Sequence, residues 1–179
     1  MAADLKPSLL TVEEYYRLPK RDDVIVELHL GSLVELSRPE AWHVDMRDRI
    51  AELLKARTGP SWKVRMALPF RAVPEYDLRA VDVGVVATER WEAAGEGDLF
   101  GSPEVVIEIL PPSIRRKEIA PKMALFLSSG TQQYCAVDQT RKTVSVTGLG
   151  DKTQVYKMND EVPFPLLGTS LKVSEILND

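Results

Sequence analysis

Apolar and polar residues alternate or cluster in short runs along the chain, and these runs predict a protein built largely from β-strands. Strict alternation from Trp62 to Leu68 is typical of a half-buried strand, while continuous apolar runs are typical of strands covered on both faces. Gly31-Ser32, between two such runs, predicts a hairpin turn. The predicted strands span residues 24–30, 33–37, 62–68, 81–87, 133–138, 143–148 and 153–158, and one more opens the stretch 105–113, where two prolines stop the apolar run.

Capping signals and helical spacing predict fewer helices. Thr11 and Glu14 form a capping box, which opens a short helix. Pro121 would cost about 3 kcal/mol inside a helix but is favoured at its first position, so the main helix is predicted to begin there and to end at a Gly130 cap. The predicted helices span 11–18, 42–57, 121–129 and 173–177, with a polar loop from 88 to 98. Together the elements predict a single domain over residues 1–179, of the α/β or α+β class, with a central mixed sheet flanked by helices.

The composition is that of an ordinary globular chain. Its 179 residues are 44% hydrophobic and 28% charged. No apolar run approaches the roughly 20 residues that span a bilayer, and the N-terminus has no signal pattern, so we expect a cytoplasmic protein without membrane segments. The single cysteine, Cys135, lies in an apolar run and is expected in the core. The net charge of −4 does not favour a nucleic-acid binder, so any such contact would need a local basic patch.

Three acidic residues interrupt apolar strand patterns: Glu27, Asp82 and Glu108. An unpaired carboxylate taken out of water costs several kcal/mol, so each acid needs a compensating partner. If the three converge in a dry cleft, a hard divalent cation such as Mg²⁺ or Mn²⁺ would stabilise them, because such ions take oxygen ligands. No histidine or cysteine set accompanies the acids, as zinc would require. A second interpretation stays open for each acid, namely a solvated sheet face or an ion pair with an arginine.

An acid-bearing strand is followed by a second one that ends in the pattern E-x-L-x-P-S, and then by a helix that carries a lysine. The order and spacing of these motifs resemble the PD-(D/E)XK nuclease superfamily, and in particular its large bacterial branch of putative restriction endonuclease domains. No single motif is highly specific, but nearly the whole chain takes part. The matching stretches are TVEEYYRLP (11–19), VELHLGSLVELS (26–37), VDVGVV (81–86), PEVVIEILPPSIRRKEIAPKMALF (103–126), GTQQYCAVD (130–138) and LGTSLKVSEIL (167–177).

The resemblance implies a restriction endonuclease-like fold and a metal-dependent site. It gives Asp82 the first metal-ligand position and Glu108 the second, with the carbonyl of Ile109 completing the metal shell. Glu27 matches an acid of the first hairpin that the family has beside the site. The implied cofactor is Mg²⁺ or Mn²⁺, which would polarise a phosphoryl oxygen and lower the pKa of a bound water.

The catalytic lysine that the resemblance implies is displaced along the chain. The superfamily usually has it two residues after the second acid, where this chain has Leu110. In this branch a lysine of the next helix matches instead, and here it is Lys122, in the first turn of the predicted helix. Lys117, five positions earlier, is the competing candidate.

Other residues are candidates for the edge of the site. His43 matches a family histidine at a helix entry, whereas His29 is interpreted as a strand residue without function. The run Arg115-Arg116-Lys117 is a candidate for nucleic-acid binding through phosphates, although a charge run is usually a solvated face.

The leading hypothesis is therefore a metal-dependent endonuclease that hydrolyses DNA. Members of the superfamily commonly pair, so a homodimer or higher homo-oligomer is expected. Two alternatives stay open: a non-catalytic relative that acts as a nucleic-acid-binding or interaction protein, and a metal-dependent hydrolase of another phosphoester. Several positions depart from the family pattern, including Gln133 where a glutamate is usual, and this keeps the non-catalytic alternative open.

Overall fold

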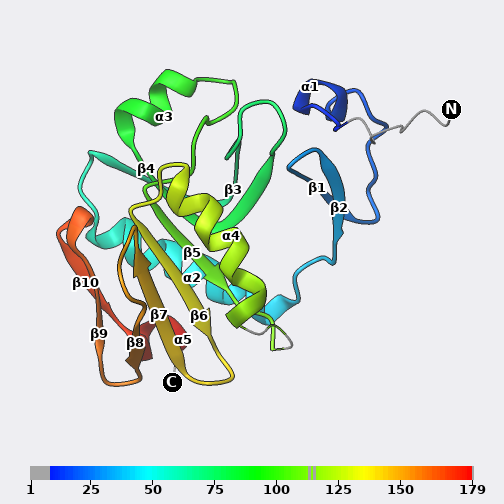
Figure 1. Ribbon diagram of the computed structural model, residues 1–179. Coiled ribbons are helices and arrows are strands. Elements are labelled where there is room, and N and C mark those ends of the chain that lie inside the picture. The colour runs from blue at the N-terminus through cyan, green and yellow to red at the C-terminus, as the bar shows by residue number, and fades with distance from the viewer. Residues whose placement is uncertain (1–8, 113, 115, 179) are drawn as a thin grey trace, which may run out of the picture.

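A computed structural model describes residues 9–112, 114 and 116–178 of the chain and shows a six-stranded mixed sheet flanked by helices (Figure 1). The predicted fold class is confirmed. The strands are β1 (Ile25–His29), β2 (Ser32–Leu36), β3 (Trp62–Phe70), β4 (Arg79–Ala87), β5 (Val105–Ile109), β6 (Gln133–Asp138), β7 (Thr143–Gly148), β8 (Gln154–Lys157), β9 (Glu161–Phe164) and β10 (Thr169–Lys172). The helices are α1 (Val12–Tyr15), α2 (Ala41–Arg57), α3 (Thr88–Ala94), α4 (Arg116–Ser128), the 3-10 helix η1 (Pro165–Leu167) and α5 (Val173–Leu177).

The large sheet has the strand order β3-β4-β5-β6-β7-β8. Strands β5 and β6 are parallel, and the other neighbouring pairs are antiparallel. Helix α4 lies in front of this sheet and α2 behind it in the view of Figure 1, while the β1–β2 hairpin lies to one side. None of the described helices is long and apolar enough to span a membrane.

Two hydrophobic cores lie on the two faces of the sheet. In the α2-side core, Ile50 and Leu54 of α2 are fully buried and pack in one cluster with Ile107 of β5. In the α4-side core, Phe126 of α4 packs in one cluster with Val106 of the same strand. Neighbouring residues of β5 therefore serve opposite cores, which confirms the prediction of a strand covered on both faces. Strand alternation directs the next even-numbered residue, Glu108, to the α4 face.

Helix α4 begins at Arg116, so the prediction that it starts at Pro121 was wrong. Pro121 lies inside the helix, where the missing N–H removes one backbone hydrogen bond. Ile119, before the proline, packs against the α4-side core, and this burial offsets the cost of the proline. The predicted end is confirmed, because Gly130 has a φ of 128° and the Thr131 N–H donates to the Phe126 carbonyl at 3.0 Å.

Several short elements differ from their predictions. Helix α1 ends at Tyr15, earlier than expected, although its capping box is present. Residues 88–94 were predicted as loop but form α3, because Trp91 and Ala94 pack against the α4-side core. Strands β9 and β10 were missed, and they form an antiparallel pair whose buried side chains belong to the α2-side core.

The β1–β2 hairpin turns at Leu30-Gly31, so the predicted turn at Gly31-Ser32 was wrong by one residue. Both turn residues have positive φ, 49° and 84°, as a tight hairpin of matching twist requires. A buried anchor holds the hairpin to the start of β4. Asp77 is fully buried, accepts a hydrogen bond from the Leu30 N–H at 3.1 Å and pairs with Arg79 at 2.7 Å. Glu27 is thereby held beside β4.

At the opposing positions Ala67 and Asp82, the alternation of side chains between the two sheet faces shifts in both β3 and β4. The β3–β4 ladder continues on both sides of this pair but leaves the pair itself out. Residues that strict alternation would keep on one sheet face lie in the α2-side core on one side of this pair and in the α4-side core on the other. The residues concerned are Val64 and Val83, then Leu68 and Val81. Ala67 has a φ of 45°, in the left-handed region that a non-glycine residue rarely adopts.

Candidate metal and catalytic site

Asp82 lies at a gap between hydrogen-bonded ladders. The β4–β5 ladder stops at Val83 and Ile107, and the next pair in that register would be Asp82 and Glu108. In place of a ladder bond, the Ile109 N–H donates to Asp82 Oδ2 at 2.8 Å. The two predicted metal-ligand acids therefore occupy opposing positions on neighbouring strands, at the end of their ladder.

Lys122 of α4 reaches the carboxylate of Glu108. The distance from Nζ to Oε1 is 3.0 Å, and the two side chains are 28% and 13% exposed. Oε1 is buried and has no hydrogen-bond partner of good geometry among the described residues, so the lysine contact is an ion pair. Nζ also lies 5.6 Å from the centre of the Phe126 ring, one turn along α4. Although α4 begins earlier than predicted, it still brings Lys122 to the acid-bearing strand.

Burial and neighbouring charges set the protonation of this pair. Burial raises the pKa of Glu108, Lys122 lowers it, and the charges of Asp82 and Glu27 raise it, which together give a pKa of about 7. Because the net shift is upward, desolvation of the carboxylate outweighs its attraction to the lysine. Burial lowers the pKa of Lys122, but the charges of Glu108, Glu27 and Asp82 outweigh this and raise it overall. The ammonium group therefore stays charged at neutral pH.

Both oxygens of Glu27 are engaged by the chain itself. Oε1 accepts a hydrogen bond from the Ala80 N–H at 2.8 Å, and Oε2 lies 2.6 Å from His29 Nε2. Glu27 is only 7% exposed, and its charge acts on Glu108. Glu27 thus lies beside the site. Because the chain engages both of its oxygens, it acts on the site through its charge. Sequence reasoning assigned His29 no function, and the structure shows it as the partner of Glu27.

His43, in the first turn of α2, lies against Asp82. Its Nε2 is 3.4 Å from Asp82 Oδ2, and its side chain is 13% exposed. Hydrogen bonding to Asp82 raises the pKa of His43, while burial opposes the shift. The buried Nδ1 has no hydrogen-bond partner among the described residues. His43 therefore lies at the edge of the site, on the α2 side of Asp82.

The predicted phosphate-binding run falls mostly beyond what the structure describes. Arg115 lies outside the described residues, and α4 opens with Arg116 and Lys117, whose side chains are not described. Phosphate contact by this run stays a prediction. Leu110, at the usual lysine position, is 8% exposed and packs in the α4-side core. A lysine there would enter an apolar cluster.

Tyr134 is a neighbour of the site that the hydrophobic pattern did not single out. It lies in β6 in register with Val106, is 1% exposed, and its hydroxyl has no hydrogen-bond partner among the described residues. Burial raises the pKa of Tyr134, and the charges of Glu108 and Asp82 raise it further. Its ring also lines a cavity of about 140 Å³ beneath Ile119 of α4. The only sequence signal for this residue is its place in the matching stretch GTQQYCAVD.

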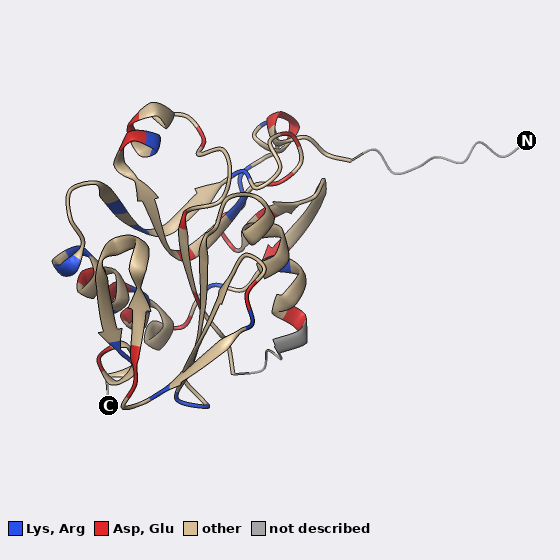
Figure 2. Cartoon of the chain, turned by 60° about the vertical axis from the view of Figure 1, so that its left-hand side comes forward, with Lys and Arg blue, Asp and Glu red and all other residues tan. Residues whose placement is uncertain are grey.

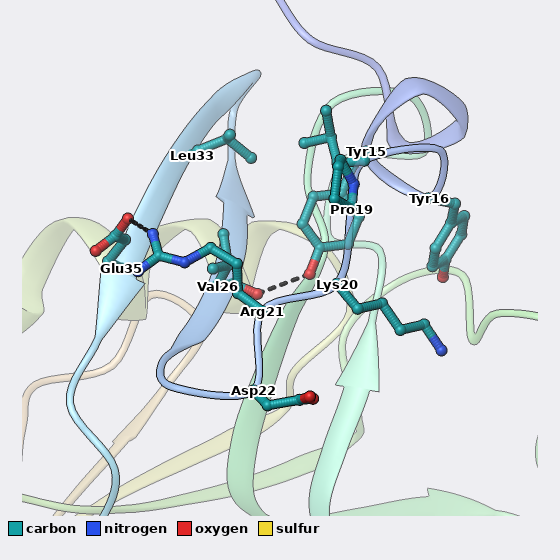
Figure 3. Close-up of a pocket in the computed structure, with 10 residues that line it drawn as sticks. Tyr15, Tyr16, Pro19, Lys20, Arg21, Asp22, Val26, Leu33 and Glu35 are labelled. Carbon is teal, nitrogen blue, oxygen red and sulfur yellow. Dashed lines mark hydrogen bonds and ion pairs between the residues drawn. The ribbon is translucent and has the colours of Figure 1, made fainter.

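A larger pocket, of about 440 Å³, lies against the hairpin residues Val26 and Leu33 (Figure 3). The Tyr15 hydroxyl donates to the Val26 carbonyl at 2.7 Å, and Arg21 pairs with Glu35 across the pocket. Since side chains alternate along a strand, Val26 points away from the face that carries its neighbour in the chain, Glu27. This pocket is therefore separate from the acids of the site.

The described side chains restrict how a metal ion could be held. Within the described residues, no group of three or more His, Cys, Asp or Glu side chains is arranged to hold a metal ion. A metal ion at this site would thus rely on the carboxylates of Asp82 and Glu108, a main-chain carbonyl and water.

Figure 2 shows Lys and Arg dispersed over several elements, in keeping with the net charge of −4.

Comparisons with known proteins relate the chain to one family and one solved fold. Residues 12–174 match the Uma2 family, described as "Putative restriction endonuclease". No curated protein sequence matches the chain. The crystal structure of a putative nuclease belonging to DUF820 from Anabaena variabilis ATCC 29413 is similar, with a TM-score of 0.80 and 19% sequence identity. The match covers 94% of this chain and 98% of that one, and at this identity it shows a shared fold.

Proposed function

Because the chain belongs to the Uma2 family of putative restriction endonucleases, we propose that it is a metal-dependent endonuclease that hydrolyses phosphodiester bonds in DNA. Family membership supports a nuclease in general terms. The observation that carries the finer proposal is the opposition of Asp82 and Glu108 at the end of the β4–β5 ladder, with Lys122 paired to Glu108.

The donor atoms at the site suit a hard divalent cation. Asp82 Oδ1 makes none of the hydrogen bonds found among the described residues, and the buried Glu108 Oε1 is ion-paired with Lys122 but has no hydrogen bond of good geometry among them. The Ile109 N–H points to Asp82, and in a strand the carbonyl of the same residue points to the same side. All three donors are oxygens, so Asp82, Glu108 and Ile109 would hold Mg²⁺ or Mn²⁺. The bound ion would polarise a phosphoryl oxygen and lower the pKa of its water.

The side chains around these donors have separate roles in the proposed reaction. Lys122 keeps its proton and would orient the attacking water and stabilise negative charge that develops on the phosphate in the transition state. Glu108 must lose its proton before it can act as a ligand, which its pKa of about 7 allows at slightly alkaline pH. His43 and the Ile109 N–H hold Asp82 in place, and Glu27 helps to keep Lys122 charged.

The proposal is tested by incubating the protein with supercoiled plasmid, linear duplex and single-stranded DNA, each with Mg²⁺, Mn²⁺ or EDTA. We expect cleavage of duplex DNA that requires the metal, is lost in Asp82→Asn and persists in the exposed control Asp22→Asn. Asn at position 82 can still accept the Ile109 hydrogen bond, so the fold should be retained.

Each other outcome points to a different conclusion. Absence of cleavage with either metal, together with DNA binding, would support the non-catalytic alternative. Hydrolysis of a small phosphodiester but of no DNA would support the alternative of a different phosphoester substrate. Equal cleavage by wild type and Asp82→Asn would contradict the site assignment. Pairing of two copies remains a prediction, which sedimentation equilibrium measures.

A further inference from the structure

Ala67 has a backbone conformation that its side chain disfavours. Its φ of 45° lies in the left-handed region, where the Cβ of an L-residue crowds the following carbonyl oxygen. The residue is exposed and belongs to no hydrophobic cluster among the described residues, so burial of its methyl group does not explain the conformation. Strained backbone that persists in a folded protein is enforced by its surroundings and often occurs beside functional residues.

The strained residue lies opposite Asp82. The β3–β4 ladder pairs Met66 with Val83 and Leu68 with Val81, and the pair between them, Ala67 and Asp82, is left out. At this point, side chains of one alternation set pass from the α2-side core to the α4-side core in both strands. A regular ladder would send residue 82 to one sheet face by strict alternation. The interruption at Ala67 removes that constraint on the Asp82 side chain.

Asp82 is also free of a regular ladder on its other side. The β4–β5 ladder ends at Val83 and Ile107, and the Ile109 N–H turns to the Asp82 carboxylate. Asp82 therefore lies between two interruptions, one at Ala67 and one at the end of β5. An extended strand with unbroken pairing on both sides would provide neither the Ile109 contact nor the approach of His43 to Oδ2 at 3.4 Å.

We propose that Ala67 is a positioning residue, whose left-handed backbone turns β4 at Asp82 so that the carboxylate meets the Ile109 N–H and faces Glu108. The consequence for metal binding rests on the proposed function, whereas the placement of the carboxylate does not. Glycine adopts the left-handed conformation without strain, and β-branched residues adopt it least readily. Substitutions at position 67 should therefore change the site according to their backbone preference and not according to their size or polarity.

The test compares Ala67→Val and Ala67→Gly with the control Met66→Val, at a neighbouring position of β3 that is 38% exposed. Amide hydrogen exchange of Ile109 in metal-free protein reports on the Asp82 contact, and calorimetric titration with Mn²⁺ alone reports on the site. In Ala67→Val we expect faster exchange at Ile109 and Mn²⁺ affinity lower by about tenfold or more, the scale for disturbing a residue that supports a metal ligand. In Ala67→Gly and Met66→Val, both measurements should match wild type, and Ala67→Gly should melt at or above the wild-type temperature.

The outcomes distinguish this inference from the proposed function. Unchanged Ile109 exchange and Mn²⁺ affinity in Ala67→Val would overturn the positioning role. If wild type binds no Mn²⁺, the proposed function fails, and Ile109 exchange still decides whether Ala67 positions Asp82. If Ala67→Val does not fold, Ala67→Gly decides, because a lower melting temperature in that variant would show that Ala67 is not strained and would overturn the inference.

Discussion

The charge of Glu108 should destabilise the metal-free protein, because its pKa is raised. Its carboxylate is desolvated, and Lys122 compensates only part of the cost, since the net pKa shift is upward. Glu108→Gln should therefore melt at or above the wild-type temperature in EDTA at pH 8, and it should lose any gain from Mg²⁺ because a ligand is gone. Thermal melting with and without Mg²⁺ measures both effects, with the exposed Glu96→Gln as control. A fall of several degrees in EDTA would show that Glu108 is chiefly a structural partner of Lys122.

The same carboxyl group predicts a pH dependence of stability. Its pKa is about 7 in the folded protein and 4.5 in the reference state, so the folded protein binds more protons between these values. The contribution of Glu108 to the free energy of unfolding is thus present at acidic pH and is lost as pH rises through 7, by up to about 1.4 kcal/mol per pH unit. Urea unfolding of metal-free wild type and Glu108→Gln from pH 5 to 8 isolates this contribution, which should make the wild-type profile fall more steeply. Parallel profiles would contradict the raised pKa.

Lys122 should support the reaction without holding the metal. An ammonium group is not a ligand, so Lys122→Ala should bind Mn²⁺, while cleavage should fall by about 10²-fold, the usual effect of losing one group that stabilises the transition state. Because Lys122 lowers the pKa of Glu108, its removal should also move the onset of metal binding to higher pH. Cleavage rates and Mn²⁺ titrations from pH 6 to 9 measure both effects. Full activity in Lys122→Ala with a collapse in Lys117→Ala would instead identify Lys117 as the catalytic lysine.

At the scale of elements, the β1–β2 hairpin offers a stability prediction independent of the chemistry. Leu30 is 50% exposed and has a φ of 49°, which leucine disfavours, and Gly31 follows it in the turn. Leu30→Asn creates the Asn-Gly pair that suits such a turn and should raise the free energy of unfolding by roughly 1 kcal/mol. Chemical denaturation measures the change, and Leu33→Asn, in the neighbouring strand, is a control without a positive φ. A loss of stability in Leu30→Asn would mean that its apolar contacts matter more than the turn.

Elements bounded by clear turn residues could be predicted to the residue. Strands β6 and β7 and helix α5 match their predicted ranges. Helix α4 was misjudged because the local cost of Pro121 is visible in the sequence, whereas the packing of Ile119 against the α4-side core is not. Strand β3 was correctly predicted as a strand, but its expected alternation breaks at Ala67, a backbone effect that the side-chain pattern does not encode.

The residue types of the candidate site could be picked out from the sequence, but their geometry could not. A carboxylate within VVIEI signals an unusual buried acid, and this signal depends on local composition alone. The opposition of Asp82 and Glu108 depends on the β4–β5 register, and the contact with Lys122 depends on how α4 packs, both of which are long-range properties. For the same reason, the engagement of both Glu27 oxygens by His29 and Ala80 had no signature in the sequence.

At the scale of the whole molecule, the site forms where segments distant in sequence meet. The hairpin brings Glu27, α2 brings His43, strands β4 and β5 bring Asp82 and Glu108, and α4 brings Lys122. Helix α2, which carries His43, packs on one sheet face, and α4, which carries Lys122, packs on the other (Figure 1). The two hydrophobic cores therefore hold these two side chains in place relative to the sheet. The fold therefore gathers like charges that repel one another, and a divalent cation would relieve that repulsion.

The most direct measurement is the anomalous scattering of a crystal soaked with Mn²⁺. We predict a single strong peak between the carboxylates of Asp82 and Glu108, within ligand distance of the Ile109 carbonyl, and no such peak in an Asp82→Asn crystal soaked in the same way. A wild-type crystal with no peak there at saturating Mn²⁺, and with the Lys122–Glu108 ion pair unchanged, would contradict the account.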